Sequence, residues 1–125
     1  MQITNYFKNY ENQIDKAIGM HHIRYRFNNH SITIIIVDMI SMWLFLQVTC
    51  EYSKETDEFI FKDYLGALFD QISDLKVNKD KSDNEILDIC LNTYGESRES
   101  LKDKLLLYMT RGMTNDLITS CNGSV

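Results

Sequence analysis

The stretch that most constrains this fold is residues 32–50, ITIIIVDMISMWLFLQVTC, because it is almost continuously apolar. Its length approaches that of a membrane-spanning helix. However, Asp38 lies about a third of the way along it, and a charge at that depth is costly to insert into a bilayer. Glu51 follows directly, so one flank lacks the basic residues that usually border a span. We therefore expect a helix buried at the centre of a water-soluble domain.

Residues 32–37 leave a second interpretation open. They are mostly β-branched and could form a short buried strand before a helix that starts near Asp38, since periodicity does not separate a buried strand from a buried helix. The chain contains no proline, and most of its five glycines fall where helical patterns stop. This distribution favours the helical interpretation.

Helical spacing of apolar residues recurs along the rest of the chain, and residues 20–31 are expected to form mainly a loop. Ser82 and Glu85 have the spacing of a capping box, and Gly95 supplies a C-terminal stop. Helices are predicted over about residues 4–19, 32–50, 53–75 (from Ser53 or Thr56), 82–94, 97–112 and 114–118. The expected fold is all-α, a single domain over residues 1–125 with five to six helices packed around a very apolar central helix (about residues 32–52).

The histidines and arginines of the predicted loop are the only concentrated groups suited to acid–base, metal or phosphate chemistry: His21, His22, Arg24, Arg26 and His30. No HExxH motif or spaced Cys/His set accompanies them, so we expect no metal and no cofactor. No other catalytic motif is present, and no catalytic residue is predicted.

Two further patterns in this loop concern RNA. The spacing of Arg24 and His30 resembles the RxxxxxH motif of the helical HEPN ribonucleases, although Tyr25 stands where that family has a polar residue. Arg24, Tyr25, Arg26 and Phe27 also form a short basic and aromatic patch of the kind that stacks bases. The acidic net charge of −5 disfavours both interpretations and favours intramolecular ion pairs or a protein interface for the arginines.

Cys50, Cys90 and Cys121 are odd in number and widely spaced, so a disulfide framework is not expected. The first two are predicted to be small buried hydrophobes and Cys121 an exposed thiol. The N-terminal sequence does not have the pattern of a secretory signal, which indicates a reducing cytoplasm. Asp38 is expected to pair with an arginine or to cap a backbone group.

Acidic residues dominate the middle of the chain, where residues 51–103 hold fourteen acidic and seven basic side chains. Part of this enrichment is explained locally, because carboxylates in a first helical turn are stabilised by the helix dipole. Together the two acidic clusters could present a negative face to a basic protein. The predicted partner-binding residues are Glu51, Glu55, Asp57, Glu58, Asp63, Asp80, Asp83, Glu85 and Asp88.

In size, acidic charge and predicted helical layout, the chain resembles the small bacterial immunity proteins of contact-dependent growth inhibition systems. The resemblance implies an antitoxin that binds and neutralises a cognate toxin domain, commonly a nuclease with a basic surface. It implies no enzymatic activity and no direct contact with nucleic acid or membrane. A Bcl-2-like protein that binds a helix in an apolar groove and a dimeric secretion chaperone with an exposed apolar groove are the other binding classes left open.

Overall fold

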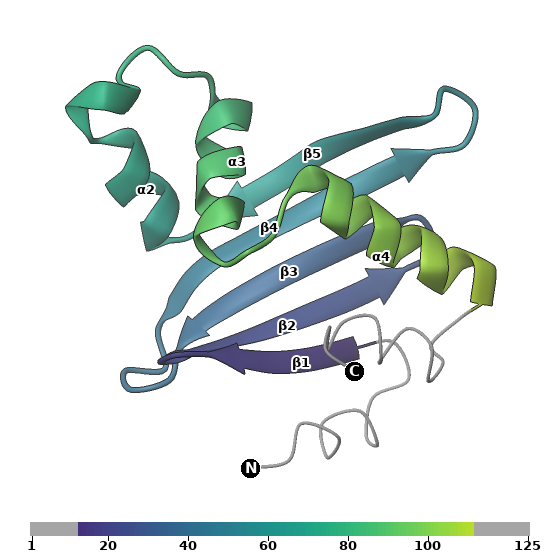
Figure 1. Cartoon of the computed structure of the whole chain (residues 1–125), viewed down its shortest axis with the longest axis horizontal. Coiled ribbons are helices and arrows are strands. Elements are labelled where there is room, and N and C mark those ends of the chain that lie inside the picture. Colours follow the sequence, from purple (N-terminus) through teal and green to yellow (C-terminus); the bar gives the residue numbers. More distant parts are fainter. Residues whose placement is uncertain (1–12, 112–125) are drawn as a thin grey trace.

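The computed structural model describes residues 13–111 of the chain, with side chains described from residue 16 to residue 110. It contains a five-stranded antiparallel sheet followed by helices, with the strands side by side in chain order (Figure 1). The strands are β1 (Gln13–Ile18), β2 (His21–Asn28), β3 (Ser31–Asp38), β4 (Leu44–Ser53) and β5 (Glu58–Leu65). The helices are α2 (Ala67–Ser73), the 3-10 helix η1 (Lys76–Asn78), α3 (Asp83–Thr93) and α4 (Arg98–Arg111). The prediction of an all-α fold is therefore wrong.

Strand β2 occupies most of the segment predicted to be a loop. Its alternate residues Ile23, Tyr25 and Phe27 are completely buried, whereas His22 and Arg24 between them point to the opposite face. This two-residue alternation is the pattern of a strand with one face on a core. The sequence carries this alternation openly, with His22, Arg24 and Arg26 at the intervening positions.

The predicted central helix is instead two paired strands. Residues 32–50 contain most of β3, a turn over residues 39–43 and the first part of β4, and the two strands pair from Ser31 with Glu51 to Val37 with Leu44. Alternation is hard to see in β3 because Ile35 and Val37, on the face away from the core, are apolar as well. The strand alternative for residues 32–37 is the correct one.

Of two other predicted helices, the one over residues 4–19 is wrong in its described part, and the one over residues 53–75 is correct only over Ala67–Ser73. The part of residues 4–19 that the structure describes forms strand β1, and residues 53–75 form β5 and the seven-residue α2. Gly66 joins these two elements with a φ of 126°, and a Cβ atom there would lie 2.5 Å from the carbonyl oxygen of Phe45. The helix predicted over residues 114–118 lies outside the described residues.

The C-terminal helices α3 and α4 confirm the predictions over residues 82–94 and 97–112. The Ser82 hydroxyl accepts a hydrogen bond from the backbone N–H of Glu85, and the Glu85 carboxylate accepts one from the backbone N–H of Ser82. This reciprocal capping box starts α3 where the sequence predicted it. After the helix, Gly95 adopts a φ of 73°, a left-handed conformation that glycine tolerates.

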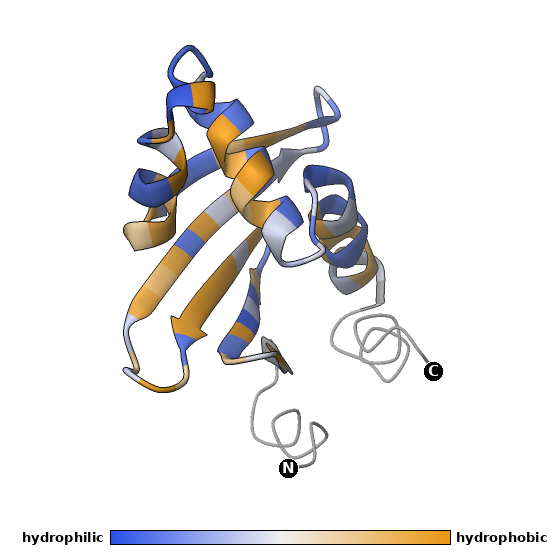
Figure 2. Ribbon diagram, turned by 60° about the vertical axis from the view of Figure 1, so that its left-hand side comes forward, coloured by the Kyte–Doolittle hydropathy of each residue, from blue (hydrophilic) through white to orange (hydrophobic). Residues whose placement is uncertain are grey.

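Helices α3 and α4 cover one face of the sheet, and the core lies between the two layers (Figures 1 and 2). We call the opposite face, which no described helix covers, the open face. Cys50 and Cys90 are buried in the core as free thiols, which confirms their predicted role, and burial raises their pKa values to about 12 and about 11. Cys121 lies outside the described residues. Among the helices that the structure describes, none is long and apolar enough to span a membrane.

Candidate functional site

Large apolar side chains are exposed on two neighbouring turns at one end of the sheet. These turns follow β1 and β3, and the backbone N–H of Met39 in one donates to the carbonyl oxygen of Met20 in the other at 2.8 Å. Within the described part of the chain, the turns and the strand ends beside them hold six of the ten large exposed hydrophobic side chains. We call this set the Met–Trp surface: Ile18, Met20, Met39, Ile40, Met42 and Trp43.

The most exposed members of the Met–Trp surface belong to the turn between β3 and β4. Ile40, Met42 and Trp43 expose 74%, 75% and 66% of their surface. Met42 also has a φ of 57°, in the left-handed region that non-glycine residues rarely occupy. Strained backbone of this kind is concentrated at functional sites. The turn therefore holds its apolar side chains in solvent at a conformational cost.

Asp38 fixes the start of this turn. Its carboxylate accepts hydrogen bonds from the backbone N–H groups of Ile40 at 2.9 Å and Ser41 at 3.4 Å. The hydrogen bond from Ile40 is the main cause of the lowered pKa of Asp38. The prediction that Asp38 caps a backbone group is confirmed.

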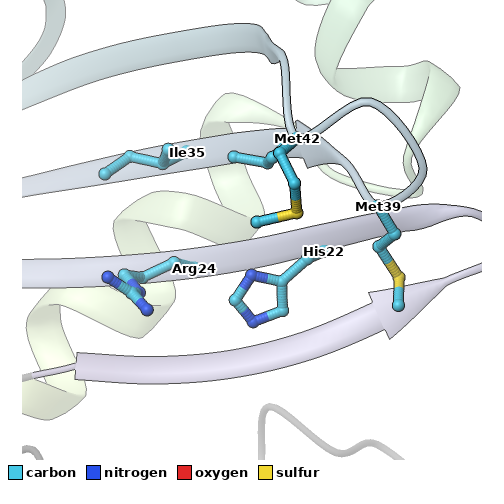
Figure 3. Close-up of a pocket in the computed structure, with 6 residues that line it drawn as sticks. His22, Arg24, Ile35, Met39 and Met42 are labelled. Carbon is cyan, nitrogen blue, oxygen red and sulfur yellow. The ribbon is translucent and has the colours of Figure 1, made fainter.

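A pocket of about 390 Å³ opens on the open face beside the Met–Trp surface (Figure 3). His22 and Arg24 enter it from β2, Ile35 from β3, and Met39 and Met42 from the turn between β3 and β4. Val37 also lines it. The pocket thus combines apolar walls with two nitrogen-bearing side chains, the composition typical of sites that bind an apolar group with an attached polar or anionic one.

The acidic residues predicted to bind a partner form two separate groups. Glu55, Asp57 and Glu58 lie at the β4–β5 turn, whereas Asp83 at the start of α3 accepts a hydrogen bond from the hydroxyl of Tyr64 near the end of β5. Glu58 and Tyr64 are six residues apart on one strand, or roughly 20 Å at about 3.3 Å per residue. Of the remaining residues, Glu51 lies on β4, Asp63 on β5, Asp80 before α3, and Glu85 and Asp88 on α3.

Several of these carboxylates are paired within the chain. Asp88 accepts from Arg98 at 2.8 Å, and Glu51 lies 3.0 Å from the Lys62 ammonium group, which lowers the pKa of Glu51. Asp57 accepts from the hydroxyl of Tyr52 at 2.7 Å, which is the main cause of its lowered pKa. The acidic side chains of the β4–β5 turn for which the structure gives no such pairing are Glu55 and Glu58, so they are the ones best placed to meet a basic partner.

The structure excludes base stacking by Tyr25 and Phe27, and it excludes a helical HEPN-type site formed by Arg24 and His30. Tyr25 and Phe27 are completely buried, so they cannot stack bases. Arg24 lies on β2 and His30 in the turn after it, six residues or roughly 20 Å further along an extended chain. This separation within one chain, together with the sheet, is incompatible with the helical HEPN arrangement.

Sequence reasoning missed a buried charged cluster around Glu96. The side chain of Glu96 is only 1% exposed and lies 3.0 Å from the ammonium group of Lys16 and 3.2 Å from that of Lys104. The hydroxyls of Tyr25 and Ser100 also donate to it. Nothing in the local sequence, GESRES, distinguishes Glu96 from an exposed linker residue. The cluster joins β1, β2 and α4.

Comparison of the chain with protein-family models, curated proteins and solved structures finds no match. In the part of the chain that the structure describes, no three His, Cys, Asp or Glu side chains are grouped so as to hold a metal ion. Within the described residues, the features that bear on function are therefore the Met–Trp surface, the adjacent pocket and the acidic β4–β5 turn.

Proposed function

We propose that this chain is a protein-binding domain without catalytic activity, and that it contacts its partner through the Met–Trp surface. The observation that carries this proposal is the exposure of Ile40, Met42 and Trp43 on a single turn. Contiguous exposed apolar patches on a folded domain mark interaction sites, because leaving them in water is unfavourable.

The residue types of this surface suit a protein interface. Tryptophan is enriched among the residues that contribute most to binding, and methionine is enriched at interfaces and adapts its shape to irregular partners. Trp43 is the only tryptophan of the chain, and it lies at the junction of the turn with β4. Trp43 is therefore the proposed anchor of the interface.

The narrower proposal is that the partner is a toxin domain and that the chain neutralises it in the cytoplasm. The helical layout no longer supports the resemblance to immunity proteins, so this proposal depends on size and charge alone. Glu55 and Glu58 supply the part of the acidic surface that could meet a basic nuclease domain. An apolar contact and an acidic contact would then lie at opposite ends of β4.

Co-expression with the C-terminal domain encoded immediately upstream of the gene tests both the protein-binding role and the narrower antitoxin role. We expect rescue of growth and a complex that co-purifies. Trp43→Ser should weaken the complex about 30-fold, the equivalent of about 2 kcal/mol for an interface anchor. Glu55→Lys with Glu58→Lys should weaken it by less and mainly at low salt.

Val77→Ser is the matched control, because Val77 is 80% exposed but lies on η1, outside the Met–Trp surface. It should leave binding unchanged. A complex that tolerates Trp43→Ser as well as it tolerates Val77→Ser would refute the Met–Trp surface as the interface. A complex that forms without rescuing growth would refute the antitoxin role and leave protein binding in place.

A further inference from the structure

Strand β5 lies at one edge of the sheet, and in the described part of the chain its strand partner is β4 (Figure 1). The backbone N–H and C=O groups on the outer side of an edge strand can pair with a further strand. Glu58, Ile60 and Lys62 are exposed, and Ile60 leaves 51% of its surface in solvent. Phe59 and Phe61 between them are only partly buried against the core. The first half of β5 is therefore accessible, and it presents apolar side chains on both faces of the sheet.

The first five residues of β5 have a symmetrical pattern. The segment 58–62, EFIFK, has one phenylalanine on each side of Ile60 and opposite charges at its two ends. If it pairs antiparallel with a second copy of itself centred on Ile60, isoleucine faces isoleucine and each phenylalanine faces a phenylalanine. Glu58 of each copy then faces Lys62 of the other. Aromatic, aliphatic and opposite-charge pairs across two strands all stabilise a sheet.

The charges at the two ends select this register. A shift of the second copy by two residues places either Lys62 or Glu58 opposite Ile60, so that a charge meets an apolar side chain. Charged residues on an edge strand discourage pairing with other strands. In this register, however, the same charges complement each other. Lys62 contacts Glu51 of its own chain at 3.0 Å and still leaves 57% of its side chain exposed to a second carboxylate.

A β-bulge ends the symmetrical segment. Phe61 and Asp63 pair with neighbouring residues of β4, so Lys62 between them is the extra residue. A bulge bends its strand and interrupts regular pairing. Leu65 lies beyond the bulge and is 48% exposed, close to the value for Ile60, but it is outside the symmetrical segment. Leu65 therefore offers a matched control position on the same strand.

We propose that the outer edge of β5 binds β5 of a second copy of this chain, antiparallel and centred on Ile60. A two-fold axis perpendicular to the sheet relates the copies, so their sheets join into one and their helices lie on the same face. The inference does not rest on the proposed function, because this edge and the Met–Trp surface share no residue. Glu58 then faces the second copy, which leaves Glu55 as the acidic side chain of the β4–β5 turn for a basic partner.

Sedimentation equilibrium of the full chain alone, over a range of concentrations, tests this dimer. We expect a reversible dimer with a Kd in the micromolar range, since the pairing of two edge strands is a small interface. Ile60→Lys should weaken the dimer at least about 100-fold, because it places like charges opposite each other at the centre of the contact. Leu65→Lys makes the same change at a similarly exposed position and should leave the dimer intact.

Charge reversal at the two ends tests the register. Glu58→Lys and Lys62→Glu should each weaken self-association about tenfold, because like charges then face each other in both symmetry-related pairs. An equimolar mixture of the two variants should dimerise within about threefold of the wild-type affinity, since each charge again faces its opposite.

A wild-type chain that stays monomeric throughout the micromolar range would overturn the inference, as would a dimer that tolerates Ile60→Lys. A mixture that associates no more tightly than the separate charge variants would overturn the register. Trp43→Ser should leave this dimer unchanged, so the result is independent of the proposed function, which fails only in the partner complex.

Discussion

Glu96 shows how one residue holds the helical layer of this protein on its sheet. Burial raises the pKa of this carboxyl, but the charge of Lys104, the hydroxyls of Tyr25 and Ser100 and the charge of Lys16 outweigh burial, so its pKa lies below the ordinary value. The charged form is therefore favoured by folding. A single charge thus connects strand β1 with helix α4, which are far apart in the sequence.

Removal of this charge should destabilise the fold. In Glu96→Gln two lysines lose their shared buried partner, and we expect the free energy of unfolding to fall by about 3 kcal/mol, as for other buried ion pairs that lose one member. Glu99→Gln, at an exposed position in the first turn of α4, should change it by less than about 0.5 kcal/mol. Urea unfolding followed by circular dichroism measures both, and equal stability of the two variants would contradict this role of Glu96.

The stabilisation from Glu96 should also depend on pH. A carboxyl whose pKa is lowered in the folded state contributes fully above its unfolded pKa of about 4.3, and the contribution is lost as the pH falls through the lower folded value. The difference in unfolding free energy between the wild-type chain and Glu96→Gln should therefore be constant near neutral pH and shrink below about pH 4. Urea titrations at several pH values check this, and a difference that grows on acidification would show that the sign is wrong.

At the scale of the secondary-structure element, the sequence correctly predicts the helices whose start and stop depend on residues close together in the chain. The capping box of α3 and the stop at Gly95 involve hydrogen bonds between residues close in sequence, so the sequence contains the whole signal. Strand β3 has no such local signal. Because Ile35 and Val37 line a pocket on the open face, β3 is apolar on both sides, and its sequence resembles that of a buried helix. The side chains that obscured the strand are those that form the candidate site.

Adjacent isoleucines of β3 offer a direct test of this two-faced strand. Ile34 is completely buried against the helices, whereas Ile35 lies on the open face. Ile34→Ala should lower the free energy of unfolding by about 3 kcal/mol, because it leaves a cavity in the core. Ile35→Ala should lower it by less than about 1 kcal/mol. Denaturation midpoints compare the two, and similar losses would indicate that the open face is covered in the intact protein.

At the scale of the whole molecule, the sheet separates two kinds of surface. The Met–Trp surface lies where β4 begins and the acidic turn lies where β4 ends, ten residues and roughly 30 Å apart. A standard interface buries about 800 Å² on each partner, which corresponds to a patch roughly 30 Å across. One partner could therefore reach both surfaces, with its apolar and basic regions at opposite ends of the contact.

The two surfaces should then control different steps of binding. Exposed charges at the rim of an interface act mainly on association, whereas buried anchors act on dissociation. For the co-purified complex, Glu55→Lys with Glu58→Lys should slow association several-fold in low salt and have little effect at high salt, where the charges are screened. Trp43→Ser should speed dissociation about 30-fold with little change in association. Surface plasmon resonance at two salt concentrations separates these rates. If the charge reversals left the association rate unchanged at low salt while Trp43→Ser still accelerated dissociation, the acidic turn would lie outside the interface and the partner would bind at the Met–Trp end alone.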